Sequence, residues 1–441
     1  MADDYFTSTS IPDGTEMQRR LEMVGYLESL VTEPIGVQLD TTANAPELQR
    51  IDINGENLNV STSFFDKHVL YGGMTVCTRT RTTGTISYGE DNAGTGLVLD
   101  ASTGKDVLVE YPMDRAFTKI DGDFYQWYIM PATTGATRYG LHPCAVQRGG
   151  TEHSKIYIGA KEAYYYLDGA TGKLGSASGK QPVTGAVSYT DLPSGSLTLD
   201  EAETYANNIG TGFGICNAWT YADIKLRMLI EYATFDIPSQ LGLGVTNLAV
   251  GDTGTYGGVL TGADSIDSNL GTNGTGSGTG VNGETPICWR GLENIYGNVF
   301  EYMAGLNMFL GSGTDGEGHA YSAGEFRVLR ADGTGEPAAT LAYNDYLVGS
   351  WPVPVTVDNY ISALQPNLTG LKLFMPQTLD GTNTTGVCDT FYHPRYDPSV
   401  VAHGGYWANG TNTGPYCMYA GCPTTYSHRM IGCRIEYYPT A

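Results

Sequence analysis

Four side chains near the C-terminal end of the chain belong to types that bind metal ions. Cys417, Cys422, His428 and Cys433 offer three sulfur atoms and one imidazole, which are ligands that Zn²⁺ prefers. No CxxC pair accompanies them, and eight cysteines in 441 residues are too few for a disulfide scaffold. We therefore interpret most of the cysteines as small, buried side chains with free thiols, and keep zinc as the alternative.

The segment from Ala408 to Met430 has the composition of a recognition surface. It is rich in tyrosine, asparagine and threonine, and such aromatic and small polar side chains form adaptable contacts. The same tyrosines could instead pack against a neighbouring protomer, because aromatic side chains are enriched in both kinds of interface. The predicted ligand-binding residues are Asn409, Asn412, Tyr416, Tyr419, Tyr426 and His428.

Two stretches form the frame around this segment. The first, WRGLENIYGNVFEY, places Gly297 and Asn298 at a tight turn, since both residue types tolerate positive φ, and then continues as a buried strand. The second begins HGGYW at His403 and closes IGCRI at Ile435. Its two glycines let the backbone pass close to another segment, and Trp407 supplies a large buried side chain.

Together these stretches resemble the formylglycine-generating-enzyme-like branch of the C-type lectin fold, whose members carry a GNVWEW-type turn and later an RGGSW…GFR pair. The segment TYADIKLRMLIEYAT stands where that family has a TEAEWEYAA-like helix. In lectin-like proteins diversified by retroelements, the variable segment also lies between a GGSW-like and an IGFR-like sequence. The resemblance covers about residues 111–441 and implies a lectin-like domain there.

The resemblance also implies two metal sites. The family's oxidases bind copper through a cysteine pair just after the GGS motif, but here ANGTNTGPY intervenes before Cys417, so we expect a scaffold rather than an oxidase. A structural calcium near the GNVxEW turn would find an amide oxygen on Asn298 and a carboxylate on Glu301, which are ligands of the hard type. Alternatively, Asn298 satisfies the backbone of the turn and Glu301 pairs with Arg290.

The composition excludes several classes of partner. A net charge of −23 without any Lys/Arg cluster disfavours nucleic acid, which is bound mainly through basic side chains. No run of about 20 apolar residues is present, so no membrane insertion is expected. The polar start MADDYFTSTS lacks the regions of a signal peptide, which predicts synthesis in the host cytoplasm.

The order of patterns along the chain predicts an α+β, β-rich fold. Residues 1–35 read as an N-terminal anchor helix that begins at Thr15, and residues 36–110 as a small antiparallel β domain. Capping signals at Thr198 and Thr220 predict two helices within the lectin-like domain at 111–441. Residues 251–284, which contain GTNGTGSGTG, are expected to form a long surface insertion.

This layout is similar to that of tailed-bacteriophage structural proteins that carry a lectin-like head. The resemblance implies a non-enzymatic virion protein, a homotrimeric tail adhesin whose N-terminal region attaches to other virion proteins. Its C-terminal head would bind a host-surface glycan or protein. Two alternatives stay open, a capsid head fibre or decoration protein with a mainly structural head, and a copper-dependent formylglycine-generating-type oxidase. No nucleophile elbow, phosphate loop or HExxH helix supports an enzyme of another class.

Overall fold

A computed structural model of the chain describes residues 32–42, 47–132, 142–147, 151–186, 192, 196–249, 256–263, 274–275, 282–314, 320–329, 346–350, 357–365 and 372–439. The anchor helix expected at 1–35 lies outside the described residues, apart from the last few positions of that range, and so does most of the insertion at 251–284.

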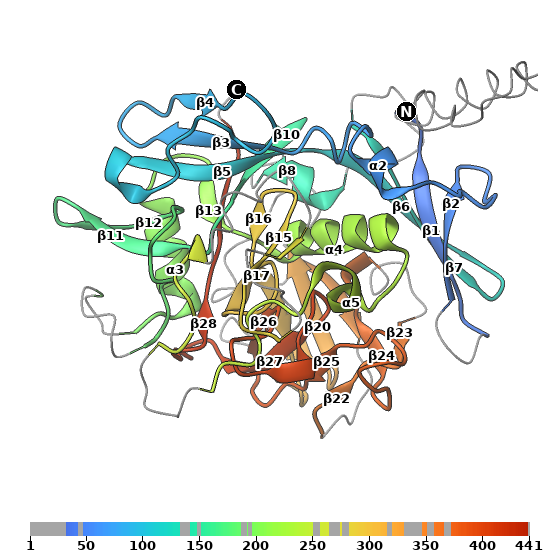
Figure 1. Cartoon of the computed structure of the whole chain (residues 1–441). Helices are drawn as coiled ribbons and strands as arrows, with labels where there is room; N and C mark the ends of the chain where they lie inside the picture. The colour runs from blue at the N-terminus through green and yellow to red at the C-terminus, as the bar shows by residue number, and fades with distance from the viewer. Residues whose placement is uncertain are drawn as a thin grey trace, which may run out of the picture.

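Three β-sheets contain most of the strand residues in the described chain (Figure 1). The first is antiparallel, in the order β2 (Glu47–Asp52), β1 (Ile35–Asp40), β7 (Phe124–Pro131), β6 (Asp114–Asp121). The second is also antiparallel, in the order β13 (Phe213–Ile215), β29 (Ile435–Tyr437), β10 (Lys155–Gly159), β5 (Lys105–Pro112), β3 (Thr75–Thr80), β4 (Ile86–Tyr88). The third and largest is mixed, in the order β21 (Tyr346–Ser350), β20 (Glu325–Leu329), β17 (Phe300–Met308), β26 (Ser399–His403), β27 (Met418–Pro423), β25 (Thr390–Tyr392), β22 (Asn359–Tyr360), and β28 (Ile431–Gly432) pairs with β17.

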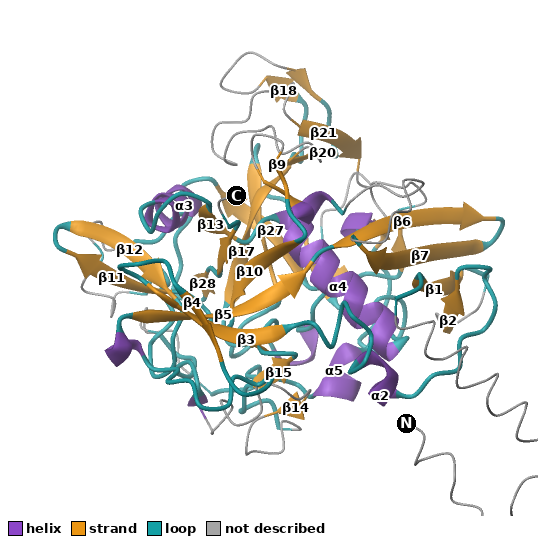
Figure 2. Cartoon of the chain, turned by 90° about the horizontal axis from the view of Figure 1, so that it is seen from above, coloured by secondary structure: helices purple, strands orange, loops and turns teal. Residues whose placement is uncertain are grey.

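Short hairpins and helices complete the architecture. The small strand groups are β11 (Tyr164–Asp168) with β12 (Thr171–Gly175), β14 (Gly274–Thr275) with β15 (Ile287–Trp289) and β16 (Leu292–Glu293), β8 (Val146–Gln147) with β9 (Thr151–Glu152), β18 (Gly313–Thr314) with β19 (Ala320–Tyr321), and β23 (Ala363–Leu364) with β24 (Pro376–Thr378). The helices are α2 (Thr62–Phe65), α3 (Leu199–Asn207), α4 (Ala218–Tyr232) and α5 (Ile237–Leu241), with 3₁₀ turns η2 (Ala101–Thr103), η3 (Pro143–Ala145) and η6 (Gly410–Asn412). Figure 2 shows the β11–β12 and β6–β7 hairpins projecting on opposite sides of α4. The fold is therefore β-rich with few helices, as the sequence predicts.

The expected boundary between a small β domain and a lectin-like domain is not a boundary between sheets. Position 110/111 falls inside β5, which pairs with β3 along one edge and with β10 along the other. Likewise β1 pairs with β7, so residues on both sides of the expected boundary share two sheets. The C-terminal strand β29 enters the second sheet between β13 and β10. The expected boundary differs from the observed sheets because alternating sequence patterns predict strands but do not identify which strands pair.

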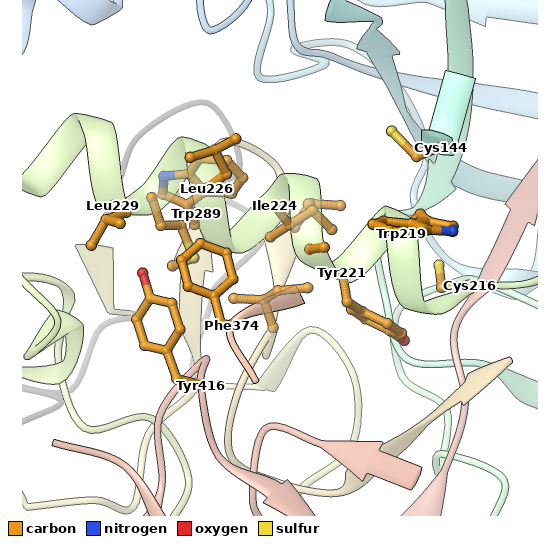
Figure 3. Close-up of a cluster of buried hydrophobic side chains, with 14 of the residues drawn as sticks. Cys144, Cys216, Trp219, Tyr221, Ile224, Leu226, Leu229, Trp289, Phe374 and Tyr416 are labelled. Atoms are coloured by element: carbon orange, nitrogen blue, oxygen red, sulfur yellow. The ribbon is translucent and has the colours of Figure 1, made fainter. Parts of the chain in front are cut away.

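Helix α4 forms the centre of the main core. It contacts β17, β1 and η3, and Figure 1 shows it between the second sheet and the strands of the third. Residues 218–231 are all buried, so the helix is enclosed on every side, and its buried side chains include those of Asp223, Arg227 and Glu231. Figure 3 shows side chains of α4, among them Trp219, Ile224 and Leu229, within this buried cluster. None of the helices in the described residues combines the length and hydropathy needed to cross a bilayer.

The two predicted helix starts have different outcomes. Thr198 caps α3 with a capping box to Glu201, as expected. The second helix begins three residues earlier than the sequence suggests, because Asn217 is its N-cap and accepts hydrogen bonds from the backbone N–H groups of residues 219 and 220. The hydroxyl of Thr220, the expected cap, donates instead to Glu436 at 2.6 Å. A tertiary contact thus takes the side chain that local spacing assigns to the cap.

Asn217→Ala should destabilise the fold strongly. The change removes the cap of a buried helix and also the hydrogen bonds from Asn217 Nδ2 to Glu436 and to the Tyr438 hydroxyl. We expect a loss of about 2–4 kcal/mol in the free energy of unfolding, measured by urea denaturation. The matched control is Asn207→Ala at the exposed end of α3, which should cost less than about 0.5 kcal/mol. Equal effects of the two changes would contradict the role of Asn217.

Candidate ligand-binding surface

The two glycine-containing turns singled out in the sequence meet each other in the fold. Gly297 and Asn298 have φ of 81° and 59°, and Gly404 and Gly405 have φ of 93° and 80°. The N–H of Gly297 donates to the carbonyl of Gly404 at 2.8 Å, and that of Trp407 donates to the carbonyl of Asn298 at 3.1 Å. A Cβ on Gly405 would lie 2.5 Å from Thr413 Oγ1, so the close passage requires glycine. These contacts fix the start of the segment between β26 and β27.

The side chain of Asn298 holds a further loop against this frame. Its Oδ1 accepts from the N–H of Val259 at 2.8 Å and from the Tyr256 hydroxyl at 3.2 Å, and its Nδ2 donates to Glu162 Oε2 at 2.7 Å. Trp407 is fully buried and packs edge-on against Tyr256. Asn298 therefore hydrogen-bonds backbone groups, as one of the two sequence-based alternatives expected, but these groups belong to a loop that is distant in the sequence.

Glu301 is the acceptor of a buried ion pair. Its Oε1 and Oε2 accept from Arg434 at 2.7 and 3.1 Å, and Oε2 also accepts from the Tyr221 hydroxyl at 2.7 Å. Arg290, the partner considered in the sequence, pairs with Glu231 at 2.6 Å. A guanidinium therefore stands where the resemblance implies calcium, and Asn298 directs its amide at Glu162. These residues do not fit a calcium site.

The cysteines expected as alternatives for zinc or copper do not converge. Cys417 and Cys422 are five residues apart along an extended segment that contains β27, which separates them by roughly 16 Å. Burial raises the pKa of both thiols, so they stay protonated and are poor nucleophiles. All eight cysteines are buried with free thiols, as predicted. Within the described residues, Cys417, Cys422, His428 and Cys433 are not among the side chains that could share an ion.

Half-buried aromatic side chains form a continuous surface over β25, β27 and their loops. We call it the aromatic patch and define it by Tyr392, Tyr406, Tyr419, Tyr426 and His428. Tyr419 stacks on the buried ring of Phe300 with centroids 5.2 Å apart and meets Tyr392 edge-on at 5.4 Å. Tyr406 also stacks on Phe300, with centroids 5.7 Å apart, and the rings of Tyr426 and His428 are parallel at 5.9 Å. Each ring is fixed by packing while part of it faces solvent.

Two predicted asparagines border this patch. Asn412 Oδ1 accepts from the Tyr360 hydroxyl at 2.6 Å, and Asn409 Oδ1 accepts from the Tyr392 hydroxyl at 3.3 Å. The Nδ2 of Asn409 has no hydrogen-bond partner although it is buried. Burial raises the pKa of Tyr392 and Tyr419, so their hydroxyls stay protonated and can donate. The border thus offers amide and phenol groups beside aromatic faces.

Tyr416 does not belong to this surface, which corrects the sequence-based assignment. Its ring is fully buried, packs edge-on against Phe235, and lies 5.1 Å from the ring of Phe374. Its hydroxyl donates to the carbonyl of Lys225 in α4 at 3.2 Å, and Figure 3 shows the ring directed into the core. Tyr416 lies two residues before β27 and turns inward because the loop returns to the sheet there.

The structure adds three tyrosines that the sequence analysis did not select, namely Tyr360, Tyr392 and Tyr406. Tyr392 could have been recognised from strand alternation, since its neighbour Phe391 is buried and the side chains of successive residues face opposite sides. Tyr406 precedes the buried Trp407 in the HGGYW sequence. Tyr360 comes from β22, and only the pairing of β22 with β25 places it near Asn412.

Asp389 supports the base of the segment from beneath. Its Oδ2 accepts from the N–H of Tyr416 at 2.7 Å, and a Cβ on Gly414 would clash with Oδ1 at 2.1 Å. Burial raises the pKa of Asp389 to about 8, and Lys225, whose pKa burial lowers to about 8, is the nearby cation. The carboxyl group therefore favours its protonated form in the folded chain below that pH.

Solved structures, but no family models or curated sequences, show similarity to this chain. No family model matches the chain, and no curated protein sequence matches it. Among solved structures, the Major Tropism Determinant U1 variant is similar, with a TM-score of 0.27 and 11% identity over 88% of this chain and 77% of that chain. The M1 variant has a TM-score of 0.25 and 12% identity over 91% and 82%. TM-scores of this size do not establish a common fold, so the likeness carries no inference about function.

Asp389→Asn should change how stability depends on pH. The folded chain keeps the Asp389 proton up to about pH 8, whereas the unfolded chain loses it near pH 3.8, so this residue lowers stability as pH rises through that window. Asparagine does not ionise and retains an acceptor for Tyr416. We expect the stability of the variant relative to the native chain to increase from pH 4 to pH 8, measured by urea unfolding. Asp121→Asn, at an exposed carboxyl, is the control, and a pH-independent difference at Asp389 would contradict the assignment.

Proposed function

We propose that this chain is a non-enzymatic receptor-binding protein of a bacteriophage virion, a tail adhesin whose C-terminal region is a lectin-like platform. The aromatic patch and its asparagine border bind a glycan or protein on the host surface. The N-terminal region attaches to other virion proteins, and the adhesin acts as a homotrimer. Support for this proposal comes from the arrangement of the patch, from its place in the fold and from the charge of the chain.

The aromatic patch is the observation that carries the proposal. Tyr406 and Tyr419 stack on the buried side chain of Phe300, so these two rings have little side-chain freedom to lose when a ligand binds. Tyrosine provides a large apolar face together with a hydroxyl, and the adjoining amides donate and accept hydrogen bonds. Flat rings bordered by phenol and amide groups suit the alternating apolar and hydroxyl faces of a sugar, or a polar protein surface.

The position of the patch also favours adhesion. Figure 1 shows β22, β25 and β27 at the lower end of the molecule, whereas β1, near the start of the described chain, runs down one side and starts near the upper end. A virion protein that attaches through its N-terminal region would thus direct the patch away from the particle. The net charge of −23 further favours hydroxyl- or amide-bearing ligands over polyanions.

Tyr419→Ala combined with Tyr426→Ala should abolish selective binding. Each change removes an aromatic face and a hydroxyl from the patch, and truncated interface tyrosines commonly cost about 2 kcal/mol each, which together exceeds a 100-fold loss of affinity. Binding of the full chain to host cells and to a glycan array provides the measurement. The control is Tyr88→Ala, because Tyr88 is 48% exposed on β4 at the other end of the molecule. Circular dichroism would confirm that both variants fold.

Other outcomes lead to different conclusions. Binding that survives the double change would place the receptor site elsewhere, and binding lost equally in the control would indicate non-specific adhesion. A native chain that shows no selective ligand and is spread over capsid facets in intact particles would be a decoration protein instead.

A further inference from the structure

Four side chains converge at the start of the central helix, far from the aromatic patch in the sequence. Asp114 begins β6, His142 and Cys144 flank the first residue of η3, and Asp223 comes from α4. One nitrogen, sulfur or carboxylate oxygen atom of each lies within 4.8 Å of those of the other three, and His142 Nδ1 is 3.0 Å from Cys144 Sγ. All four residues are at most 2% exposed. Within the described chain, this is the sole group of three or more such side chains arranged in this way.

The two buried carboxyl groups of this cluster share a single cation. None of the four oxygens of Asp114 and Asp223 has a well-formed hydrogen bond, and neither does the nearby hydroxyl of Tyr111. The nearby cation is Arg227, whose Nε lies 3.0 Å from Asp223 Oδ2 and whose Nη2 lies 3.6 Å from Asp114 Oδ1. Its two Nη groups already donate to the carbonyls of Leu70 and Pro112. One guanidinium thus faces two buried carboxyl groups, an arrangement that costs free energy unless a further cation or a shared proton is present.

We propose that Asp114, His142, Cys144 and Asp223 form a structural binding site for a divalent metal ion of the zinc type. Two oxygens, one nitrogen and one sulfur complete a four-ligand tetrahedral set, and zinc accepts all three donor types. The charges balance, since two carboxylates and one thiolate are neutralised by a divalent ion together with Arg227. Ligand atoms in such a site are about 3–4 Å apart, so small side-chain rotations close the cluster around the ion.

The position of the cluster defines the role of the ion. It joins β6, η3 and α4, three elements that are distant in the sequence and meet at the main core. Because every ligand is buried, the ion enters while the chain folds, and its binding free energy contributes to folding. All four protein ligands fill the coordination shell, which characterises a structural rather than a catalytic zinc site.

Refolding of the full chain with metal tests this assignment. The chain is denatured with a chelator and refolded with Zn²⁺ or Co²⁺, and the bound metal is counted after gel filtration. We expect about one ion per chain, a higher midpoint of thermal unfolding than without metal, and a cobalt–thiolate charge-transfer band. Cys144→Ser should lose that band. Cys216→Ser, the matched control, should keep it, because Cys216 is also buried and Figure 3 shows it on the other side of Trp219.

The native chain alone can overturn the proposal. If it refolds without bound metal and its unfolding midpoint is the same with and without Zn²⁺, the cluster is a proton-sharing carboxylate pair and not a metal site. A cobalt–thiolate band that persists in Cys144→Ser would place the ion at another cysteine. If Cys144→Ser does not fold, His142→Asn replaces it, with loss of the bound ion as the expected result and an unchanged metal content as the contradicting one.

Discussion

The buried ion pair between Arg434 and Glu301 links the second sheet to the third. Arg434 lies where the chain leaves β28, beside β17, and enters β29 in the second sheet. Besides Glu301, its guanidinium donates to the carbonyls of Gly159 and Glu293 at 2.8 and 2.7 Å. Removing two charges from water is costly, and the pair is tolerable because its donors and acceptors are satisfied in this way. Strands of two sheets, and α4 through Tyr221, are thereby held at one point.

The surroundings of this pair follow the same rule. Lys161 pairs with Glu293 at 2.6 Å with both side chains fully buried, and Asn298 joins Glu162 to the loop at Val259. Displacing any member of such a network would leave buried polar groups unpaired and lower the stability of the fold. The network therefore fixes the two glycine turns in one arrangement. The aromatic patch rests on this fixed base through Phe300, which follows the Asn298 turn. A recognition surface requires a rigid base and side chains that are partly exposed, and the buried network and the aromatic patch provide these two features.

Much of the local structure could be predicted from the residues alone. The turn at Gly297 and Asn298, the capping box at Thr198, the burial of Trp407 and the free thiols all follow from side-chain size and backbone preference. Interactions between distant residues could not be predicted in this way. Spacing assigned the cap of α4 to Thr220, which instead bonds Glu436, and composition assigned Tyr416 to the surface, although it packs on α4. In both cases a partner more than 190 residues away decided the outcome.

Composition and local patterns are enough to predict the β-rich character of the chain, the positions of its tight turns, and the segment that carries Tyr419, Tyr426 and His428 of the aromatic patch. These properties depend on alternation, on positive φ and on composition, which are local. Contacts between distant segments set the rest: residues on both sides of position 110 share their sheets, Glu301 faces Arg434, and Asp114, His142, Cys144 and Asp223 meet. A strand pair or a buried ion pair depends on which of many possible partners the whole fold brings into contact. A local sequence pattern contains only one member of each pair, so it cannot identify the other.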